Sequence, residues 1–237
     1  MPYQPTIVRA VTRPPGDEVR ELAQLGTATV HEAYRRRGLL SGISSMVPGS
    51  DAGGPAVTCL NYAGDNLMIH AALEVCRPGD VLVVAVTAPS LHGMLGELLA
   101  TVCVARGLAG VVLDAGVRDI VQVRAMGLPV FARTVSALGT TKAGLGYVNV
   151  PVSCGGVVVA PGDVVVGDDD GVVAVERDAV AEVLSAGRRR QAREIDVRER
   201  YAAGALTLDT GTMRETLQKG GVVYLDGTGA AVTEDDA

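Results

Sequence analysis

The hydrophobic pattern is most regular in the middle of the chain, where apolar runs of two kinds alternate. Residues 81–88 and 110–116 are short, nearly continuous apolar runs that are rich in β-branched residues. Such runs are typical of strands that are covered on both faces. Residues 66–76, 93–107 and 118–127 instead carry apolar residues at helical spacing, which predicts three helices.

Two further strands extend this pattern. Residues 128–135 predict a third buried strand, and residues 55–62 alternate like a half-buried one. The order strand, helix, strand, helix, strand between residues 81 and 135, with short connections, predicts parallel pairing. The middle of the chain is therefore expected to form the parallel core of an α/β fold.

The N-terminal part is less regular. Residues 1–16 carry four of the eleven prolines and predict an extended arm. Asp17 is placed to cap a helix over 19–25, and a second helix is predicted over 27–38. Residues 39–55 are rich in Gly, Ser and Pro, which favours a loop or an irregular strand.

The pattern changes after residue 150. Residues 154–176 predict short antiparallel strands separated by PGD and DDDG turns, and the DDDG run lacks the spaced ligands of a calcium loop. Residues 178–204 predict a long, charged helical arm, and residues 225–237 a frayed tail. With no repeat or linker, the whole chain is predicted to be one α/β domain with a parallel βαβ core, antiparallel strands and a C-terminal helical arm.

Composition narrows the classes of function. The 237 residues include 21 Lys and Arg against 27 Asp and Glu, a net charge of −6, which disfavours a general nucleic-acid binder. One Phe, six Tyr and no Trp leave little surface for base stacking. The apolar runs are too short to span a membrane, and Arg and Pro stand where a signal peptide needs apolar residues. A cytoplasmic protein is expected.

Cysteine and histidine point away from zinc. The four cysteines are widely scattered and form no CxxC pair, and the three histidines show no metal-ligand spacing. Each cysteine is therefore expected to behave as a small apolar residue.

Parallel strands also predict where polar chemistry gathers. The carboxyl end of each strand and the start of the next helix lie at one edge of the sheet, where ligands bind. The first βα junction places Glu97 in the opening turn of a helix, and the second places Asp114 at a strand end, followed by Arg118 and Asp119. Three carboxylates and a guanidinium are thus expected at one rim.

This set suits a hard divalent cation together with a small anion. Mg²⁺ takes oxygen ligands and needs only one or two protein carboxylates, and Arg is a natural partner for a carboxylate or a developing enolate. The turn over residues 96–99 could bind an anion through helix N-terminal N–H groups. The alternative is structural, because acidic residues favour first helical turns and an Arg-Asp pair there can simply cap and bridge. Asp114 either orients Arg118 or closes the turn.

At these residues the chain resembles the RraA-like class II pyruvate aldolases, which are the 4-hydroxy-4-methyl-2-oxoglutarate / 4-carboxy-4-hydroxy-2-oxoadipate aldolases. The hallmark of that family is an acidic residue, twenty intervening positions and then Arg-Asp, and Glu97 is followed by twenty residues and then by Arg118 and Asp119. The order and spacing of other segments over about 20–220 also fit the family. These segments are GTATVHEAYRRRGLL (26–40), GDNLMIHAAL (64–73), PGDVLVV (78–84), GELLAT (96–101), DAGVRD (114–119), SALGTTK (136–142), VNVPV (148–152) and PGDVVVGDDDGVV (161–173).

The resemblance implies a swivelling β/β/α-like fold that assembles as homotrimers or homohexamers, with active sites between subunits. It implies Mg²⁺ or Mn²⁺ as cofactor and the cleavage or formation of a 4-hydroxy-2-oxo acid, with pyruvate as one partner. Asp119 matches the metal ligand, Arg118 matches the residue that contacts the pyruvyl oxygen and stabilises the enolate, and Glu97 matches the residue that holds metal-bound waters. The substrate carboxylate is expected at the backbone of Gly96, Leu98 and Leu99.

A glutamate from a neighbouring subunit belongs to the same expectation. Glu194 is the best match, and Glu199 is the alternative. With Glu97 it would hold the water or hydroxide that takes the proton from the C4 hydroxyl. Arg118, Glu97 and Glu194 are therefore the expected catalytic residues.

Other polar residues have two interpretations each. His92, in the loop 88–96, is either an acid–base or substrate-contacting residue or a solvated loop side chain. Glu32 either reaches a neighbouring site or serves packing and capping, and His70 is expected to be a buried or interface helix residue. Lys142 follows no Walker pattern, and a Schiff-base role is not expected because the metal set already provides the electron sink.

Two alternatives to the aldolase remain open. A decarboxylase of oxaloacetate or a similar 2-oxo acid would use the same enolate-stabilising groups. A non-catalytic binding protein is the other, because relatives of this fold include an inhibitor of a ribonuclease. Some relatives carry a methyltransferase label, but the chain has no GxGxxG loop.

Overall fold

The computed structural model describes residues 4–225 and 227. Contacts divide the chain into a large unit that ends at Gln191 and a small unit that begins at Ala192. The frayed tail predicted over 225–237 lies, apart from Leu225 and Gly227, outside the described residues.

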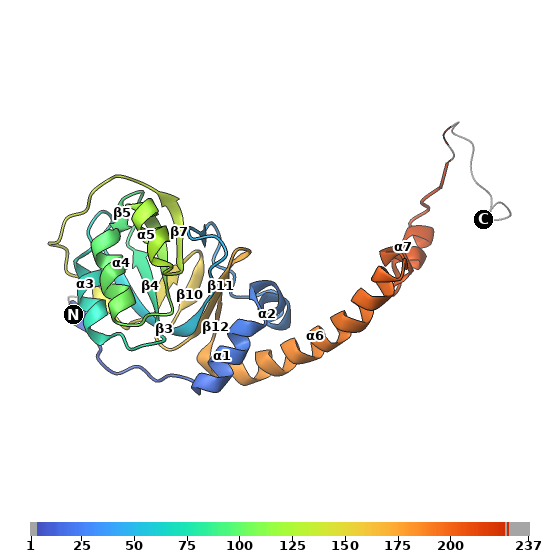
Figure 1. The fold of residues 1–237 in the computed structure, drawn as a ribbon, viewed down its shortest axis with the longest axis horizontal. Coiled ribbons are helices and arrows are strands. Elements are labelled where there is room, and N and C mark those ends of the chain that lie inside the picture. Colours follow the sequence, from blue (N-terminus) through green and yellow to red (C-terminus); the bar gives the residue numbers. More distant parts are fainter. Residues whose placement is uncertain (1–3, 226, 228–237) are drawn as a thin grey trace. The chain divides into compact units, whose positions relative to one another are not determined.

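The core of the large unit is the predicted parallel sheet. Strands β3 (Ala52–Asn61), β4 (Val81–Val86), β6 (Gly110–Val117) and β7 (Val130–Val135) lie side by side in this order, each parallel to the next. They alternate with the helices α3 (Leu67–Val75), α4 (Glu97–Ala105) and α5 (Ile120–Met126). The three helices lie next to one another beside the sheet (Figure 1). The α/β class and the parallel βαβ core are confirmed.

The alternation of side chains along the strands creates two separate apolar layers. Leu82 and Val84 of β4 pack with buried residues of α3, α4 and α5. Val81 and Val83 of the same strand pack on the opposite face, in a cluster with Phe131. A central strand must be apolar on both faces, which explains its continuous run of Val and Leu.

The second face of the sheet is covered by the antiparallel strands predicted over 154–176. Strands β9 (Val152–Cys154) and β10 (Val157–Val159) form one pair, and β11 (Val164–Asp168) and β12 (Gly171–Val175) form another. Every second residue of β11 and β12 faces the sheet. The residues between them face an outer layer that contains α1 (Gly16–Gln24) and α2 (Thr27–Ala33).

The acidic run between β11 and β12 is a hairpin turn, as predicted. Its first residue also reaches a distant helix. Asp168 accepts hydrogen bonds from the backbone N–H (2.8 Å) and the hydroxyl of Thr27, the first residue of α2. A carboxylate at this position satisfies an unpaired N–H group at the helix start.

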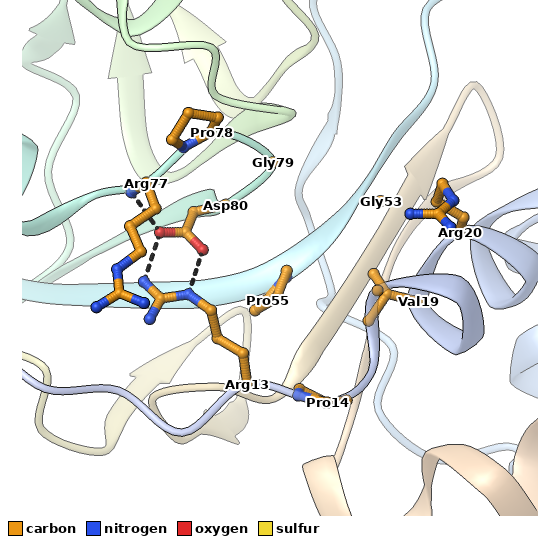
Figure 2. Close-up of a pocket in the computed structure, with 11 residues that line it drawn as sticks. Arg13, Pro14, Val19, Arg20, Gly53, Pro55, Arg77, Pro78, Gly79 and Asp80 are labelled. Carbon is orange, nitrogen blue, oxygen red and sulfur yellow. Dashed lines mark hydrogen bonds and ion pairs between the residues drawn. The ribbon is translucent and has the colours of Figure 1, made fainter.

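The described part of the N-terminal arm is held to the rest of the unit at two places. Strand β1 (Thr6–Ile7) pairs with β8 (Tyr147–Val148), which borders β3. Further along, Arg13 and Asp80 form a two-point ion pair (Figure 2), with Nε–Oδ1 2.8 Å and Nη2–Oδ2 2.7 Å. The Asp80 side chain is only 1% exposed, so this arm is part of the packed unit.

Element boundaries differ from the sequence prediction most clearly at three places. The helix expected over 93–107 begins only at Glu97, because Gly93–Leu95 forms a short strand, β5, parallel to β6. Helix α2 ends at Ala33 rather than near Gly38, because the following arginines include two with positive φ. The helix expected over 19–25 starts earlier, at Gly16, so Asp17 lies inside it and makes no capping hydrogen bond.

The predicted arm over 178–204 is confirmed as a helix. A 3₁₀ turn (Arg177–Ala179) leads into α6 (Val180–Ala202), whose first turns are buried against the outer layer. The rest of the chain forms a second 3₁₀ turn (Thr207–Asp209) and α7 (Met213–Lys219). Strand β2 (Ser44–Ser45) completes the edge beside β7. None of the helices in residues 4–225 is long and apolar enough to cross a membrane.

Candidate functional site

The two predicted βα junctions meet at one rim of the sheet. Arg118 and Asp119 follow β6, and Glu97 begins α4. The Asp119 carboxylate accepts a hydrogen bond from the Glu97 backbone N–H (3.0 Å), and its Oδ2 lies 3.6 Å from Arg118 Nε. The Arg118 backbone N–H donates to the Leu95 carbonyl at 2.9 Å. Residues twenty-odd positions apart are therefore held together, as the sequence predicted.

Glycine makes this approach possible. A Cβ atom on Gly96 would lie 2.8 Å from Arg118 Nε and closer still to Asp119 Oδ2. A Cβ atom on Gly93 would lie 2.8 Å from Arg118 Cβ and 2.6 Å from the Ser136 carbonyl oxygen. Asp119 itself has φ +52°, a left-handed conformation that is uncommon outside glycine. The backbone is thus shaped to bring Arg118 and Asp119 against the start of α4.

A pocket of about 80 Å³ opens beside this pair. It takes residues from both junctions and also from segments that follow β3 and β7. Its lining residues are Asn66, His70, Gly93, Gly96, Leu98, Leu99, Arg118 and Lys142. The expected substrate-binding residues Gly96, Leu98, Leu99 and Arg118 are therefore brought together.

The charges in this pocket are mainly positive. Arg118 and Lys142 supply two cationic side chains. Partial burial and the neighbouring Lys142 charge lower the pKa of His70, so its imidazole is neutral at pH 7. Two cations and the N-terminal N–H groups of α4 favour an anionic ligand.

Three of these residues, His70, Asn66 and Lys142, were not predicted to line the site. His70 was expected to be a buried or interface helix residue. Its side chain is exposed within this chain and lines the pocket, so the prediction of burial is wrong, and the interface stays a prediction. Asn66 and Lys142 were not assigned to the site. The signal was available, because β3 and β7 are parallel to β4 and β6 and end at the same edge. Ligands bind at the edge where parallel strands end, so the residues that follow β3 and β7 are expected at the site as well as those that follow β4 and β6.

Asn66 is nearly inaccessible, with 5% exposure. Its Nδ2 donates to the Met94 carbonyl at 3.0 Å, whereas its buried Oδ1 has no hydrogen-bond partner among the described residues. An unsatisfied buried acceptor is costly. Asn66 therefore presents one oxygen that a donor could satisfy.

Asp114 does not belong to this pocket, which corrects both interpretations of it. Strand β6 continues to Val117, so Asp114 lies within the strand rather than at its end. Its carboxylate pairs with Arg133 of β7 and accepts a hydrogen bond from the Gly155 N–H at 3.1 Å. It lines a different hollow with Arg133 and Ser153, and among the described residues it makes no hydrogen bond or ion pair with Arg118.

Other candidate residues take structural contacts. His92 Nδ1 lies 3.1 Å from Ser90 Oγ, and its ring lies against Gly64, so it is half-buried rather than a freely solvated loop side chain. Glu32 pairs with Arg36 one turn later in the chain, at 3.1 Å. A larger hollow of about 340 Å³ surrounds the Arg13–Asp80 pair (Figure 2), but there the buried carboxylate already engages Arg13.

The four cysteines behave as predicted, as buried free thiols. Burial raises the pKa of Cys59, Cys76 and Cys103 to about 12 and also raises that of Cys154. These thiols are protonated at neutral pH and therefore poor nucleophiles.

Within residues 4–225, no group of three or more His, Cys, Asp or Glu side chains is clustered as a metal site. The donors at the rim are the half-exposed Asp119 carboxylate and the exposed Glu97, which begins α4. A hard divalent cation fits such a set, because Mg²⁺ keeps several waters and uses one or two carboxylates. Glu194 and Glu199 lie on the part of α6 that belongs to the small unit, and their role stays a prediction.

The model of the RraA-like family, described as Aldolase/RraA, matches residues 27–174. The chain belongs to the RraA-like family. A relative from Halalkalibacterium halodurans, named provisionally as a 4-hydroxy-4-methyl-2-oxoglutarate aldolase, is 35% identical over 162 residues, which are 68% of this chain and 77% of the relative.

Solved RraA-like structures share the fold. Streptomyces coelicolor RraAS2, described as an unusual member of the RNase ES inhibitor RraA protein family, has a TM-score of 0.72 and 33% identity over 80% of this chain and 99% of that one. A Geobacillus kaustophilus protein described as an S-adenosylmethionine:2-dimethylmenaquinone methyltransferase has a TM-score of 0.60 and 32% identity, over 65% and 97% of the two chains. Proteins with this fold thus carry names from several functional classes, so the fold alone does not decide the activity.

Proposed function

We propose that this RraA-like protein is a class II pyruvate aldolase that cleaves, or forms, a 4-hydroxy-2-oxo acid. One observation carries the proposal. Arg118 and Asp119 meet the start of α4 beside a small pocket that Lys142 also lines. A protein that only binds another protein has no need of this convergent set of charges in a small hollow.

The pocket fits the anionic pyruvyl half of such a substrate. The backbone N–H groups of Leu98 and Leu99 lie in the first turn of α4, where helical N–H groups have no partner within the helix. We assign them to the substrate carboxylate, which the helix N-terminus favours. Lys142 and His70 then face the more distant part of the substrate, and Lys142 favours a second carboxylate there.

Asp119 is assigned as the protein ligand of Mg²⁺ or Mn²⁺, with Glu97 holding waters nearby. A bound divalent cation supplies Lewis-acid stabilisation of negative charge on the keto oxygen. The Arg118 guanidinium donates to the same oxygen, where charge develops in the transition state.

The proton steps are assigned to waters held by carboxylates. Glu97, with Glu194 of a neighbouring copy, holds a water that accepts the proton of the C4 hydroxyl. The C3–C4 bond then breaks, and its electron pair forms the pyruvate enolate as the C4 oxygen becomes a carbonyl. A water protonates C3 to give pyruvate. The use of Glu194 requires a homo-oligomer, a trimer or a hexamer, and light scattering of the purified protein tests that requirement.

Arg118→Ala tests the assignment. Removal of one preorganised donor to a developing oxyanion lowers kcat by about 10²–10³-fold. Pyruvate release from 4-hydroxy-4-methyl-2-oxoglutarate is followed by NADH oxidation with lactate dehydrogenase. Arg9→Ala is the matched control, because Arg9 is an exposed arginine of the N-terminal arm. Wild-type turnover by Arg118→Ala, with Arg9→Ala also unchanged, would contradict the proposal.

The same assay with oxaloacetate tests the decarboxylase alternative. Loss of CO₂ from oxaloacetate also leaves the pyruvate enolate, so Arg118 would stabilise both reactions. The ratio of kcat/KM for the two substrates ranks them. If neither substrate is turned over, a binding role such as that named for the Streptomyces coelicolor relative becomes the stronger interpretation.

A further inference from the structure

Asp65 is a buried carboxylate that has no part in the chemistry proposed above. Its exposure is 4%, and it lies between β3 and α3, immediately before Asn66. A buried carboxylate is costly unless hydrogen bonds satisfy it. Its partners therefore indicate what it holds in place.

The Asp65 carboxylate joins two segments that lie far apart in the sequence. Oδ1 accepts a hydrogen bond from the backbone N–H of Leu67 at 2.9 Å, in the first turn of α3. Oδ2 accepts one from the Thr141 hydroxyl and one from the Ala143 N–H, both at 2.7 Å. Thr141 and Ala143, the two residues that donate to Oδ2, are the neighbours of Lys142 in the sequence.

Backbone contacts reinforce this junction. The Thr141 N–H donates to the Gly64 carbonyl at 2.9 Å, and the Asn66 N–H donates to the Thr141 carbonyl at 3.1 Å. A Cβ atom on Gly144 would lie 3.2 Å from Asp65 Cγ, so the segment is packed closely against the carboxylate. Lys142 thus projects from a short stretch of backbone that is fixed on both sides.

We propose that Asp65 is a positioning residue that places Lys142 in the anion pocket. Lysine has a flexible stem with four carbons, so the direction of its ammonium depends strongly on where its backbone is held. The role rests on the proposed function, because Lys142 is assigned there to the distant carboxylate of the substrate. It goes beyond that function because Asp65 lies outside the pocket and yet determines how tightly the pocket binds the substrate.

A double-mutant cycle tests whether Asp65 acts through Lys142. Lys142→Met removes ground-state binding, so KM rises by about tenfold and kcat stays within about twofold. Asp65→Asn is expected to raise KM by a similar factor, because its amide N–H cannot accept from Thr141 and Ala143. In the double variant the second change should add less than about twofold, as expected of residues that act as one unit.

Thr141→Val provides a gentler variant if Asp65→Asn folds poorly. It removes one hydrogen bond to the carboxylate and is expected to raise KM by about threefold. Thr140→Val makes the same change one residue earlier, at a hydroxyl without a hydrogen-bond partner among the described residues, and should leave KM unchanged.

Limited trypsin digestion gives a readout that does not depend on activity. Cleavage after Lys142 requires local opening of its segment. Asp65→Asn and Thr141→Val should accelerate that cut at least about fivefold relative to the cut after Arg9, and Thr140→Val should not.

The outcomes separate the two proposals. Non-additive KM values with a selective increase in cleavage after Lys142 support the positioning role. KM increases that multiply in the double variant overturn it. If the wild-type protein turns over neither substrate, the aldolase proposal fails and digestion alone decides. Selective cleavage then supports the placement of Lys142 by Asp65, and equal acceleration at both cuts overturns it.

Discussion

Gly96→Ala is the sharpest test of how the site is built, because it changes no charged or reacting group. The new Cβ atom would lie 2.8 Å from Arg118 Nε, 2.9 Å from Arg118 Cγ and nearer still to Asp119 Oδ2. Ordinary contacts between such atoms are about 3.5 Å. Arg118 must therefore retreat by roughly 0.6 Å and the Asp119 carboxylate by more.

Such a displacement should cost turnover and leave the fold intact. A misplacement of about 1 Å at a reacting centre can lower the rate by about 10²-fold. Gly96 has φ −133° and ψ −171°, an extended conformation that alanine adopts without strain. The reduced entropy of the unfolded chain offsets part of any packing cost, by about 0.4–1 kcal/mol.

The assay compares kcat and the thermal midpoint of Gly96→Ala with those of Gly139→Ala. Gly139 is a matched control, because a Cβ atom there meets nothing within 4 Å and its φ is not positive. We expect kcat to fall by about 10²-fold only in Gly96→Ala, with both midpoints within a few degrees of wild type. Normal kcat in a folded Gly96→Ala variant would refute the view that this glycine fixes the Arg118–Asp119 geometry.

Three further predictions concern stability and metal dependence. Arg13→Ala leaves the nearly inaccessible Asp80 carboxylate without its ionic partner. The free energy of unfolding, measured in urea, should therefore fall by about 3 kcal/mol, against less than about 0.5 kcal/mol for Arg9→Ala. Equal losses in the two variants would mean that the ion pair contributes nothing to stability. Burial alone would raise the pKa of Asp65, but hydrogen bonds from the N–H groups of Ala143 and Leu67 and from the Thr141 hydroxyl lower it to about 2, from 3.8. A group whose pKa is lowered on folding stabilises the folded state fully above its unfolded pKa, and this stabilisation is lost as the pH falls through the folded pKa. About 2 kcal/mol of the free energy of unfolding should therefore disappear between pH 4 and pH 2 in the wild type and not in Asp65→Asn. EDTA should abolish pyruvate release, with Mg²⁺ or Mn²⁺ restoring it; full activity after exhaustive chelation would contradict the metal assignment to Asp119 and leave that of Arg118 standing.

The parallel core was predictable because its signal is local. Each strand such as Val81–Val86 is a continuous apolar run that only a doubly covered strand needs. Strand β5 was not predictable in this way. Gly93–Leu95 is three residues long, continues the apolar spacing of α4, and becomes a strand only by pairing with β6. Its formation depends on a partner that lies farther along the chain.

The site was predictable to the same extent. Glu97, Arg118 and Asp119 were found because they follow strands whose ends share one edge. Asp114 was misplaced because β6 continues beyond it to Val117, so its carboxylate lies within the strand and beside Arg133 of β7. Lys142 was missed because the segment SALGTTK (136–142) fitted the family without assigning a role to its lysine. Its place is set by Asp65, which lies 77 residues before it in the sequence.

Gly93, Gly96 and the left-handed Asp119, here called the floor of the pocket, depend on backbone shape, whereas His70 and Lys142, here called its wall, come from two other segments of the chain. Substitution of the wall therefore leaves the floor in place. An engineer who wants a new acceptor molecule can vary positions 70 and 142 in a combinatorial library while the residues around Gly93 and Gly96 stay constant.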